Sequence, residues 1–212
     1  MNDSQNRSHL RHLARADVYR LLSACFYQPE EIFLEEELFG QLKTAMAKVS
    51  PQRVPDGASL ESSFRKTGLE ALQLDYSRLF LGPFEIPAKP YGSVYLDGEK
   101  VVMGDSTLQA LALYREANFE IAGDFREMPD HVAVELEFLY LLSFRIGQTE
   151  DHEDQARLGA LKRRFLEEHL GQWIGTFSEA IQQSAESDFY KQLADLTEQF
   201  VREDLQELTE VV

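Results

Sequence analysis

One segment constrains the fold more than any other: residues 131–147, HVAVELEFLYLLSFRIG, would be apolar almost all round a helix. Glu135 and Glu137 are the only acidic residues in the segment. A helix with apolar side chains on every face is stable only when other elements surround it. The segment therefore predicts a central, buried helix, and Pro129 predicts that this helix begins just before His131.

Amphipathic helices are predicted on both sides of this segment, because apolar residues recur there at helical spacing. The stretch SPQRVPDG, residues 50–57, predicts a connector, and Gly68 weakens the helix that follows it. Ser106 or Thr107 is the predicted cap of the helix after residue 105. Cys25 falls on the apolar stripe of the first helix, which predicts a core position. The predicted outer helices cover residues 10–26, 30–49, 60–80, 106–123, 153–170, 172–185 and 188–209.

Residues 82–105 interrupt this helical pattern with three prolines and four glycines, so no long helix is expected there. Apolar and aromatic residues in the segment argue against disorder, and ordered loops of this length tend to be functional. The part SVYLDGEKVVM is compatible with a hairpin around Asp97-Gly98. We predict a single all-α domain over residues 1–212, a bundle of about eight or more helices, with an N-terminal half at 1–81, a hinge or loop at 82–105 and a C-terminal half at 106–212.

Composition excludes several classes of function. The net charge of −16 makes nucleic acid an unfavourable partner, because phosphates would be repelled. An acidic surface can attract a basic peptide, although solubility alone would also explain it. Cys25 is the only cysteine, so a disulfide framework is excluded and a reducing compartment fits. No window reaches the roughly 18 apolar residues of a membrane span, so we expect no membrane insertion and a cytoplasmic protein.

Signatures of catalysis and cofactor binding are missing from the sequence. It has no Glu-x-x-His pair for a di-iron site, no HEXXH, no phosphate loop ending in Lys-Ser or Lys-Thr, no GxSxG and no GxGxxG. We therefore predict no metal, no cofactor and no enzymatic activity. Four histidines are expected on the surface, namely His9, His12, His152 and His169.

The remaining polar constellation is EMPDH, residues 127–131, at the start of the central helix. Asp130 is positioned to cap that helix, and His131 would then be a satisfied structural histidine. A remote alternative is a small hydrolase that uses Asp130 and His131 as an acid–base pair, although no nucleophile or metal set accompanies them.

Two motifs in a fixed order give the sequence a resemblance to a known family. The first combines Tyr76, Leu79, Phe80 and Gly82, followed by Pro83, and it is similar to an aromatic-x-x-Leu-Phe-x-Gly pattern. Residues 90–95, PYGSVY, and residues 104–106, GDS, follow it, and EMPDH comes next. Together these motifs resemble the TorD/DmsD/NarJ family of redox-enzyme maturation chaperones. EMPDH has its proline one place later than the family signature, and Tyr91 stands where DmsD-like members often have Trp.

The resemblance implies an all-helical cytoplasmic chaperone. Such a chaperone would bind the twin-arginine leader and the apo form of the catalytic subunit of a molybdopterin oxidoreductase, and it would delay export until the cofactor is inserted. The alternative within the family is a NarJ-like assembly factor for a membrane-anchored subunit that is never exported. The family allows both monomers and exchanged homodimers.

A twin-arginine leader combines two guanidinium groups with an apolar stretch, so its receptor needs an apolar groove with acidic residues at one end. We expect aromatic and proline side chains to form the groove walls and glycines to fold the loop back tightly. Asp130, with Glu127, would bind an arginine of the leader. His131 would orient the Asp130 carboxylate or sense its charge. The predicted peptide-binding residues are Tyr76, Leu79, Phe80, Gly82, Pro83, Pro90, Tyr91, Gly92, Ser93, Tyr95, Gly104, Glu127, Asp130 and His131.

Overall fold

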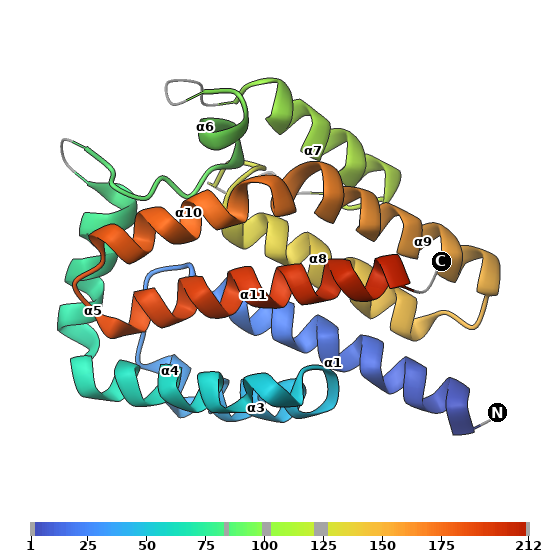
Figure 1. Ribbon diagram of the computed structural model, residues 1–212, viewed down its shortest axis with the longest axis horizontal. Helices are drawn as coiled ribbons and strands as arrows, with labels where there is room; N and C mark the ends of the chain where they lie inside the picture. Colours follow the sequence, from blue (N-terminus) through green and yellow to red (C-terminus); the bar gives the residue numbers. More distant parts are fainter. Residues whose placement is uncertain (1–2, 83–84, 99–102, 121–126, 211–212) are drawn as a thin grey trace.

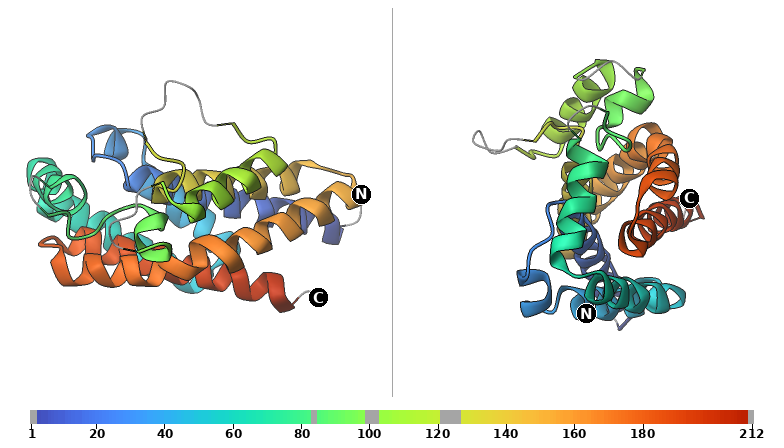
Figure 2. Two further views of the ribbon diagram at one scale, coloured as in Figure 1. Left: turned by 90° about the horizontal axis from the view of Figure 1, so that it is seen from above. Right: turned by 90° about the vertical axis from the view of Figure 1, so that its left-hand side faces the viewer.

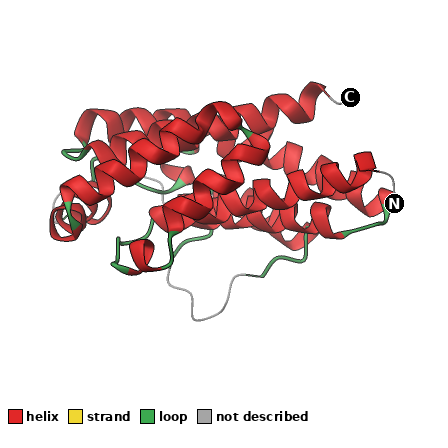
Figure 3. Ribbon diagram, turned by 90° about the horizontal axis from the view of Figure 1, so that it is seen from below, coloured by secondary structure: helices red, strands yellow, loops and turns green. Residues whose placement is uncertain are grey.

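The computed structural model describes residues 3–82, 85–98, 103–120 and 127–210. In these ranges the chain forms helices and loops without a strand, which confirms the predicted all-α class (Figure 3). The α-helices are α1 (Asp3–Cys25), α2 (Ile32–Glu35), α3 (Leu38–Val49), α4 (Val54–Thr67), α5 (Leu69–Tyr76), α6 (Gly92–Leu96), α7 (Asp105–Glu116), α8 (Val132–Gln148), α9 (His152–Phe165), α10 (Gly171–Ser184) and α11 (Asp188–Glu210).

Helix α8 is the predicted central helix, and most of its residues are buried. It runs antiparallel to α1, since the Ser23 hydroxyl donates a 2.9 Å hydrogen bond to the carbonyl of Ala133 and Leu13 lies against Gly147 at the other end. Helices α6 and α7 lie on one side of this pair and α3 and α4 on the opposite side (Figures 1 and 2).

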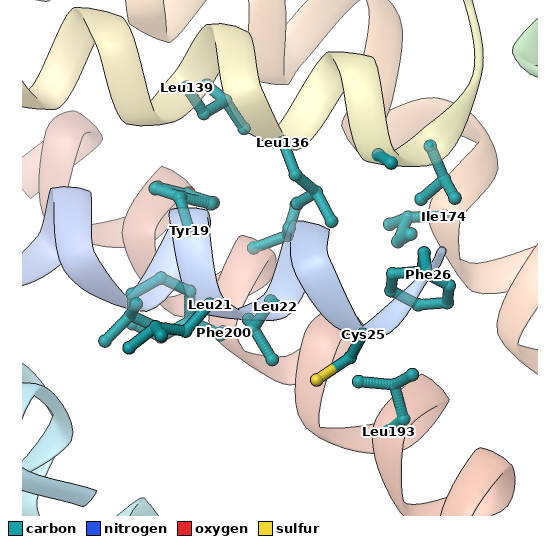
Figure 4. Close-up of a cluster of buried hydrophobic side chains, with 14 of the residues drawn as sticks. Tyr19, Leu21, Leu22, Cys25, Phe26, Leu136, Leu139, Ile174, Leu193 and Phe200 are labelled. Carbon is teal, nitrogen blue, oxygen red and sulfur yellow. The ribbon is translucent and has the colours of Figure 1, made fainter. Parts of the chain in front are cut away.

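The core is built where α1 and α8 meet α10 and α11 (Figure 4). Leu136 and Leu139 of α8 point toward α1, and Cys25 is buried there, as its place on the apolar stripe predicted. The aromatic and aliphatic side chains that fill this region are Tyr19, Leu22, Phe26, Ile174, Leu193 and Phe200.

The N-terminal helices are more broken than the sequence predicted. Residues 30–49 were expected to form one helix, but the chain forms α2 and α3, separated at Glu37, which has a left-handed backbone with φ of 53°. Three successive glutamates, residues 35–37, follow the start of α2, and negative charge at a helix C-terminus is unfavourable. Gly68, with φ of +80°, ends α4 and separates it from α5.

Residues 51–57 do not form the predicted connector. Pro51 opens a short 3-10 turn, Pro51–Arg53, and Pro55 lies in the first turn of α4. Proline is tolerated there because the first backbone N–H groups of a helix have no intrahelical acceptor. After α5 the helix continues as a π-helical turn, Ser77–Leu81, and ends at Gly82.

The described part of the Pro/Gly-rich segment contains the short helix α6. The predicted hairpin around Asp97-Gly98 is therefore wrong for its first strand, because Ser93 to Leu96 are helical; its second strand falls partly outside the described residues. The predicted caps of α7 are also wrong. The carboxylate of Asp97 accepts hydrogen bonds from the backbone N–H of Ser106, at 3.0 Å, and from the Ser106 hydroxyl, at 2.6 Å.

The C-terminal helices follow the sequence prediction closely, except that α9 runs through a π-helical turn, Leu166–Leu170, into α10. Helix α7 ends at Glu116, before the predicted end near Gly123, which itself lies outside the described residues. Helix α11 packs against α4 and α10, so it joins elements from both ends of the chain. Within the described ranges, no helix is both long and apolar enough to cross a membrane.

Candidate functional site

The predicted loop and the start of α8 are joined directly by the backbone. Tyr91 and His131 form an isolated antiparallel bridge. The N–H of Gly92 donates to the carbonyl of Asp130 at 2.8 Å, and the N–H of Val132 donates to the carbonyl of Pro90 at 2.8 Å. The structure therefore brings the two motifs of the sequence together, although they are about forty residues apart.

Asp130 is fully buried at this junction and does not cap α8, which corrects the sequence prediction. Its Oδ2 accepts a 2.9 Å hydrogen bond from the N–H of Ser93 in the first turn of α6. Because the backbone bonds of Asp130 and Val132 fix this stretch against residues 90–92, the carboxylate faces α6 instead of its own helix. Its Oδ1 is buried without a hydrogen-bond partner among the described residues.

His131 is the N-cap of α8. Its Nδ1 accepts a 3.2 Å hydrogen bond from the N–H of Ala133, which places the proton of the neutral ring on Nε2. Burial lowers the pKa of His131 to about 4, and the nearby Asp130 carboxylate offsets this only in part. At neutral pH the ring is therefore uncharged; that it orients the Asp130 carboxylate or senses its charge stays a prediction.

An aromatic group with an acidic edge surrounds His131. Tyr27, which follows α1, stacks on the His131 ring with centroids 6.1 Å apart, and Tyr91 meets the ring edge-on at 5.4 Å. The Tyr91 hydroxyl donates to Glu127 at 3.4 Å, and the Tyr27 hydroxyl donates to Glu137 at 3.0 Å. Both tyrosines and both glutamates are partly exposed, so this group forms a rim at the molecular surface.

Beneath the loop lies a buried polar group that sequence reasoning missed. Glu135 of α8 bonds to His169 Nε2 at 2.8 Å and accepts a 3.1 Å hydrogen bond from the indole N–H of Trp173. Tyr95 stacks on Trp173 with centroids 5.5 Å apart. A side chain at Gly92 would place its Cβ 3.0 Å from the Trp173 nitrogen, so any larger residue would have to displace Trp173 or Glu135 by a few tenths of an ångström. The sequence signal that could have revealed this group was Glu135 itself, an acidic residue inside an apolar helix, because a buried carboxylate needs hydrogen-bond or charged partners.

The surface prediction for histidines is therefore wrong for His169, which is 1% exposed. Burial alone would lower the pKa of His169, but the Glu135 carboxylate outweighs it and raises that pKa. Burial raises the pKa of Glu135. His152 is exposed as predicted, whereas His9 and His12 are half-buried.

The predicted groove walls near residue 80 lie in the core. Tyr76 is 7%, Leu79 0% and Phe80 3% exposed, so these side chains offer almost no surface to a partner. Gly82 has φ of +26°, and a Cβ there would come within 2.5 Å of the Glu85 carbonyl, which explains the glycine.

The other loop residues have mixed positions. Pro90, Gly92 and Ser93 are buried, and Tyr91 and Tyr95 are half-buried. Gly104 has φ of −84°, which any residue adopts, so it does not supply the tight fold expected of it. Pro83 lies outside the described residues.

Comparison with known proteins gives consistent matches. The family model described as nitrate reductase delta subunit matches residues 36–179. The chaperone protein TorD of Shewanella loihica is 28% identical over 211 residues, covering 92% of this chain and 93% of its own. A protein of Haemophilus influenzae described as "Probable Tat proofreading chaperone DmsD" is 30% identical over 189 residues, covering 87% of each chain.

A solved structure shares the fold. It is a protein of Archaeoglobus fulgidus described as "A Putative Redox Enzyme Maturation Protein", which is 23% identical and has a TM-score of 0.54. The match covers 92% of this chain and 93% of that one. At this identity the likeness establishes the helical arrangement and no shared partner.

Proposed function

The chain belongs to the nitrate reductase delta subunit family and is a redox-enzyme maturation chaperone of the TorD and DmsD kind. We propose that its client is a molybdopterin oxidoreductase. In this proposal the chaperone acts in the cytoplasm and holds the apo form of the catalytic subunit. It also holds the twin-arginine leader of that subunit until the cofactor has been inserted.

The observation that supports this proposal most directly is the joining of the Pro90–Tyr95 segment to the start of α8. The junction presents a rim of tyrosine side chains with Glu127 and Glu137 beside them. Aromatic side chains suit an apolar peptide, and partly exposed carboxylates suit a guanidinium group. A leader that carries both kinds of group matches the rim.

The roles of the predicted residues differ within this proposal. Asp130 and His131 are buried and bonded to Ser93 and Ala133, so they shape the rim. Tyr91 and Glu127 are partly exposed at the rim and can touch a peptide there, whereas Tyr95, which is also half-buried, stacks on Trp173. The acid–base pair of a hydrolase is a poor description of Asp130 and His131, because both side chains are almost completely buried and offer no surface to a substrate.

A calorimetric titration with the leader peptide of a candidate client tests the proposal. The full chain is expected to bind the peptide, and Glu127→Gln to weaken binding without a change in melting temperature. Asp130→Ala is expected to lower both the affinity for the peptide and the melting temperature, since it removes the hydrogen bond to the Ser93 N–H that holds α6. A chain that binds no leader at all, while binding the apo catalytic subunit, would contradict leader recognition and leave client binding intact.

The matched family model gives a reason to keep a second candidate function. Its description refers to a nitrate reductase subunit, so a NarJ-like assembly factor for a membrane-anchored enzyme that is never exported is the alternative client relationship. Pull-down from anaerobically grown cells separates the two: capture of a catalytic subunit that carries a leader supports export proofreading, and capture of one without a leader supports the alternative.

A further inference from the structure

A cleft of about 370 Å³ opens between α1 and α8, next to Phe119, just after α7. It continues the rim described above, because Tyr27 and Glu137 belong to both. Beyond Phe119, the lining side chains are Arg20, Ser23, Ala24 and Tyr27 from α1 and the turn after it, and Glu137, Tyr140 and Leu141 from α8.

The carboxylate in the cleft is held by a neutral donor. Glu137 Oε1 accepts a 3.0 Å hydrogen bond from the Tyr27 hydroxyl, and the Ser23 oxygen, whose proton goes to the Ala133 carbonyl, lies 3.4 Å away. No ion pair to Glu137 is found in the described part of the chain. Arg20 is the cation among the lining residues. It is turned to Gln41, at 3.2 Å, and to Asp17, at 3.8 Å. The Glu137 charge thus remains available to a cation from outside.

An apolar strip leads away from this carboxylate along α8. Glu137, Tyr140, Leu141 and Phe144 are spaced three, four and seven residues apart, so they share one face of the helix. The Tyr140 and Phe144 rings are 5.9 Å apart, and Phe144 is 39% exposed. The strip is about 10 Å long at 1.5 Å per residue, enough for three extended residues of a bound peptide.

We propose that this cleft binds the twin-arginine leader, with an arginine on Glu137 and the apolar stretch along Tyr140 and Phe144. The inference rests on the proposed function and locates its binding site. Charge complementarity selects the occupant, because an apolar strip that begins at an unpaired carboxylate matches a peptide in which a cation precedes apolar residues. Of the apolar walls first predicted, four are buried and two, Tyr91 and Tyr95, are half-buried; the buried ones are Tyr76, Leu79, Phe80 and Pro90.

The test uses the full chain, a synthetic leader peptide and calorimetry. Glu137→Gln keeps an acceptor for the Tyr27 hydroxyl and removes the charge, and Ala24→Leu fills the cleft with a helix-compatible side chain. Each is expected to weaken binding about ten-fold or more. Phe144→Ala, at an exposed position, is expected to weaken it about three-fold. Glu179→Gln, an exposed acid on α10, is the matched control and should leave affinity unchanged.

A second peptide, with both arginines replaced by glutamine, separates direct contact from a general loss of negative charge. If Glu137 meets an arginine, Glu137→Gln should weaken the wild-type peptide about ten-fold and the substituted peptide little. An equal effect on both peptides would overturn the contact with Glu137. Melting temperatures measured in parallel show whether each variant is folded. If Ala24→Leu does not fold, Phe144→Ala still tests the cleft.

The outcomes distinguish this inference from the proposed function. The cleft assignment would be overturned, and leader recognition kept, if three variants bind the leader as the wild-type chain does; these are Glu137→Gln, Ala24→Leu and Phe144→Ala. Absence of wild-type binding would overturn leader recognition, and the cleft assignment with it. Altered self-association in Ala24→Leu, measured by sedimentation, with unchanged peptide affinity would make the cleft an interface between two copies of the chain and would also overturn the inference.

Discussion

Asp130 and His131 are adjacent residues that hold two different helices. His131 caps its own helix α8 through Nδ1, whereas the carboxylate of Asp130 bonds to the Ser93 N–H of α6. The sequence predicted that Asp130 would cap α8, because its carboxylate can accept a hydrogen bond from a backbone N–H group. Which of them caps α8 depends on the bridge between Tyr91 and His131, a contact between distant parts of the chain.

His131 should make stability depend on pH. Burial lowers its pKa from 6.5 to about 4 in the folded chain, so between these values the unfolded chain binds a proton that the folded chain does not. Stability contributed by the neutral ring is therefore present above pH 6.5 and is lost as the pH falls toward 4. Asn can cap the helix without titrating, so His131→Asn should reduce this loss by roughly 3 kcal/mol at most. Urea unfolding of both chains between pH 4 and 7 measures the difference; parallel curves would contradict the prediction.

Gly92 and Gly159 form a matched pair of glycines in helices. A Cβ at Gly92 would lie 3.0 Å from the Trp173 nitrogen and 3.1 Å from Glu135 Oε1, whereas a Cβ at Gly159 would meet nothing within 4 Å. Gly92→Ala should therefore destabilise the fold by about 1–3 kcal/mol through overpacking. Gly159→Ala should stabilise it by about 0.5–1 kcal/mol through helix propensity. Chemical denaturation of the two variants checks both signs, and stabilisation by both would show that Trp173 yields at no cost.

At the scale of elements, α1, α9 and α11 are joined by buried charges. Asp204 of α11 is fully buried and lies 2.6 Å from Lys162 Nζ and 2.9 Å from Arg15 Nε. The Tyr19 hydroxyl donates to the same carboxylate at 2.5 Å. Burial lowers the pKa of Lys162 to about 8, although Asp204 opposes this shift. The amphipathic patterns predicted these helices, but the charged residues within them gave no sign of being buried.

Removing the central carboxylate should be costly, because it leaves the buried Lys162 without its ion-pair partner and leaves Arg15 with Glu207 alone. We expect Asp204→Asn to lower the free energy of unfolding by about 3–5 kcal/mol. Glu198→Gln, which breaks an i,i+4 pair with the exposed Arg202 on the same helix, should cost less than about 1 kcal/mol. Urea titrations of both variants provide the comparison, and a similar small cost for each would mean that the buried pairs contribute little.

For the whole molecule, the net charge of −16 should act on the association of a cationic peptide. Raising the salt concentration from 50 to 500 mM is expected to weaken leader binding and to slow association, because the Debye length falls below about 10 Å. Stopped-flow association at several salt concentrations measures the effect. The peptide with arginines replaced by glutamine is the control, and an equal salt dependence for both peptides would contradict electrostatic steering.

Local pattern was sufficient for most of the bundle. Periodicity located α1, α8, α10 and α11, and it placed Cys25 in the core. The predictions failed at boundaries, such as the break at Glu37 and the helical turn at Pro55, where packing decides whether a weak signal ends a helix.

The candidate site was predicted in part. The sequence identified the Pro90–Tyr95 loop and the Asp130-His131 pair, and the structure joins them. Tyr27 and Glu137 carried no motif, since one follows a helical stripe and the other is an acid in the central helix. Leu79 and Phe80 were expected at the surface of a groove, but an apolar residue type cannot distinguish a groove wall from the core.

By itself the sequence determined the all-helical class, the central place of α8 and the family, because each depends on local spacing or on motifs. Only the tertiary structure decided that Asp130 bonds to α6, that His169 is buried against Glu135, and that Tyr27 and Glu137 lie beside the loop junction. The physical reason is that a hydrogen bond or a buried charge depends on atoms brought together by packing of distant helices.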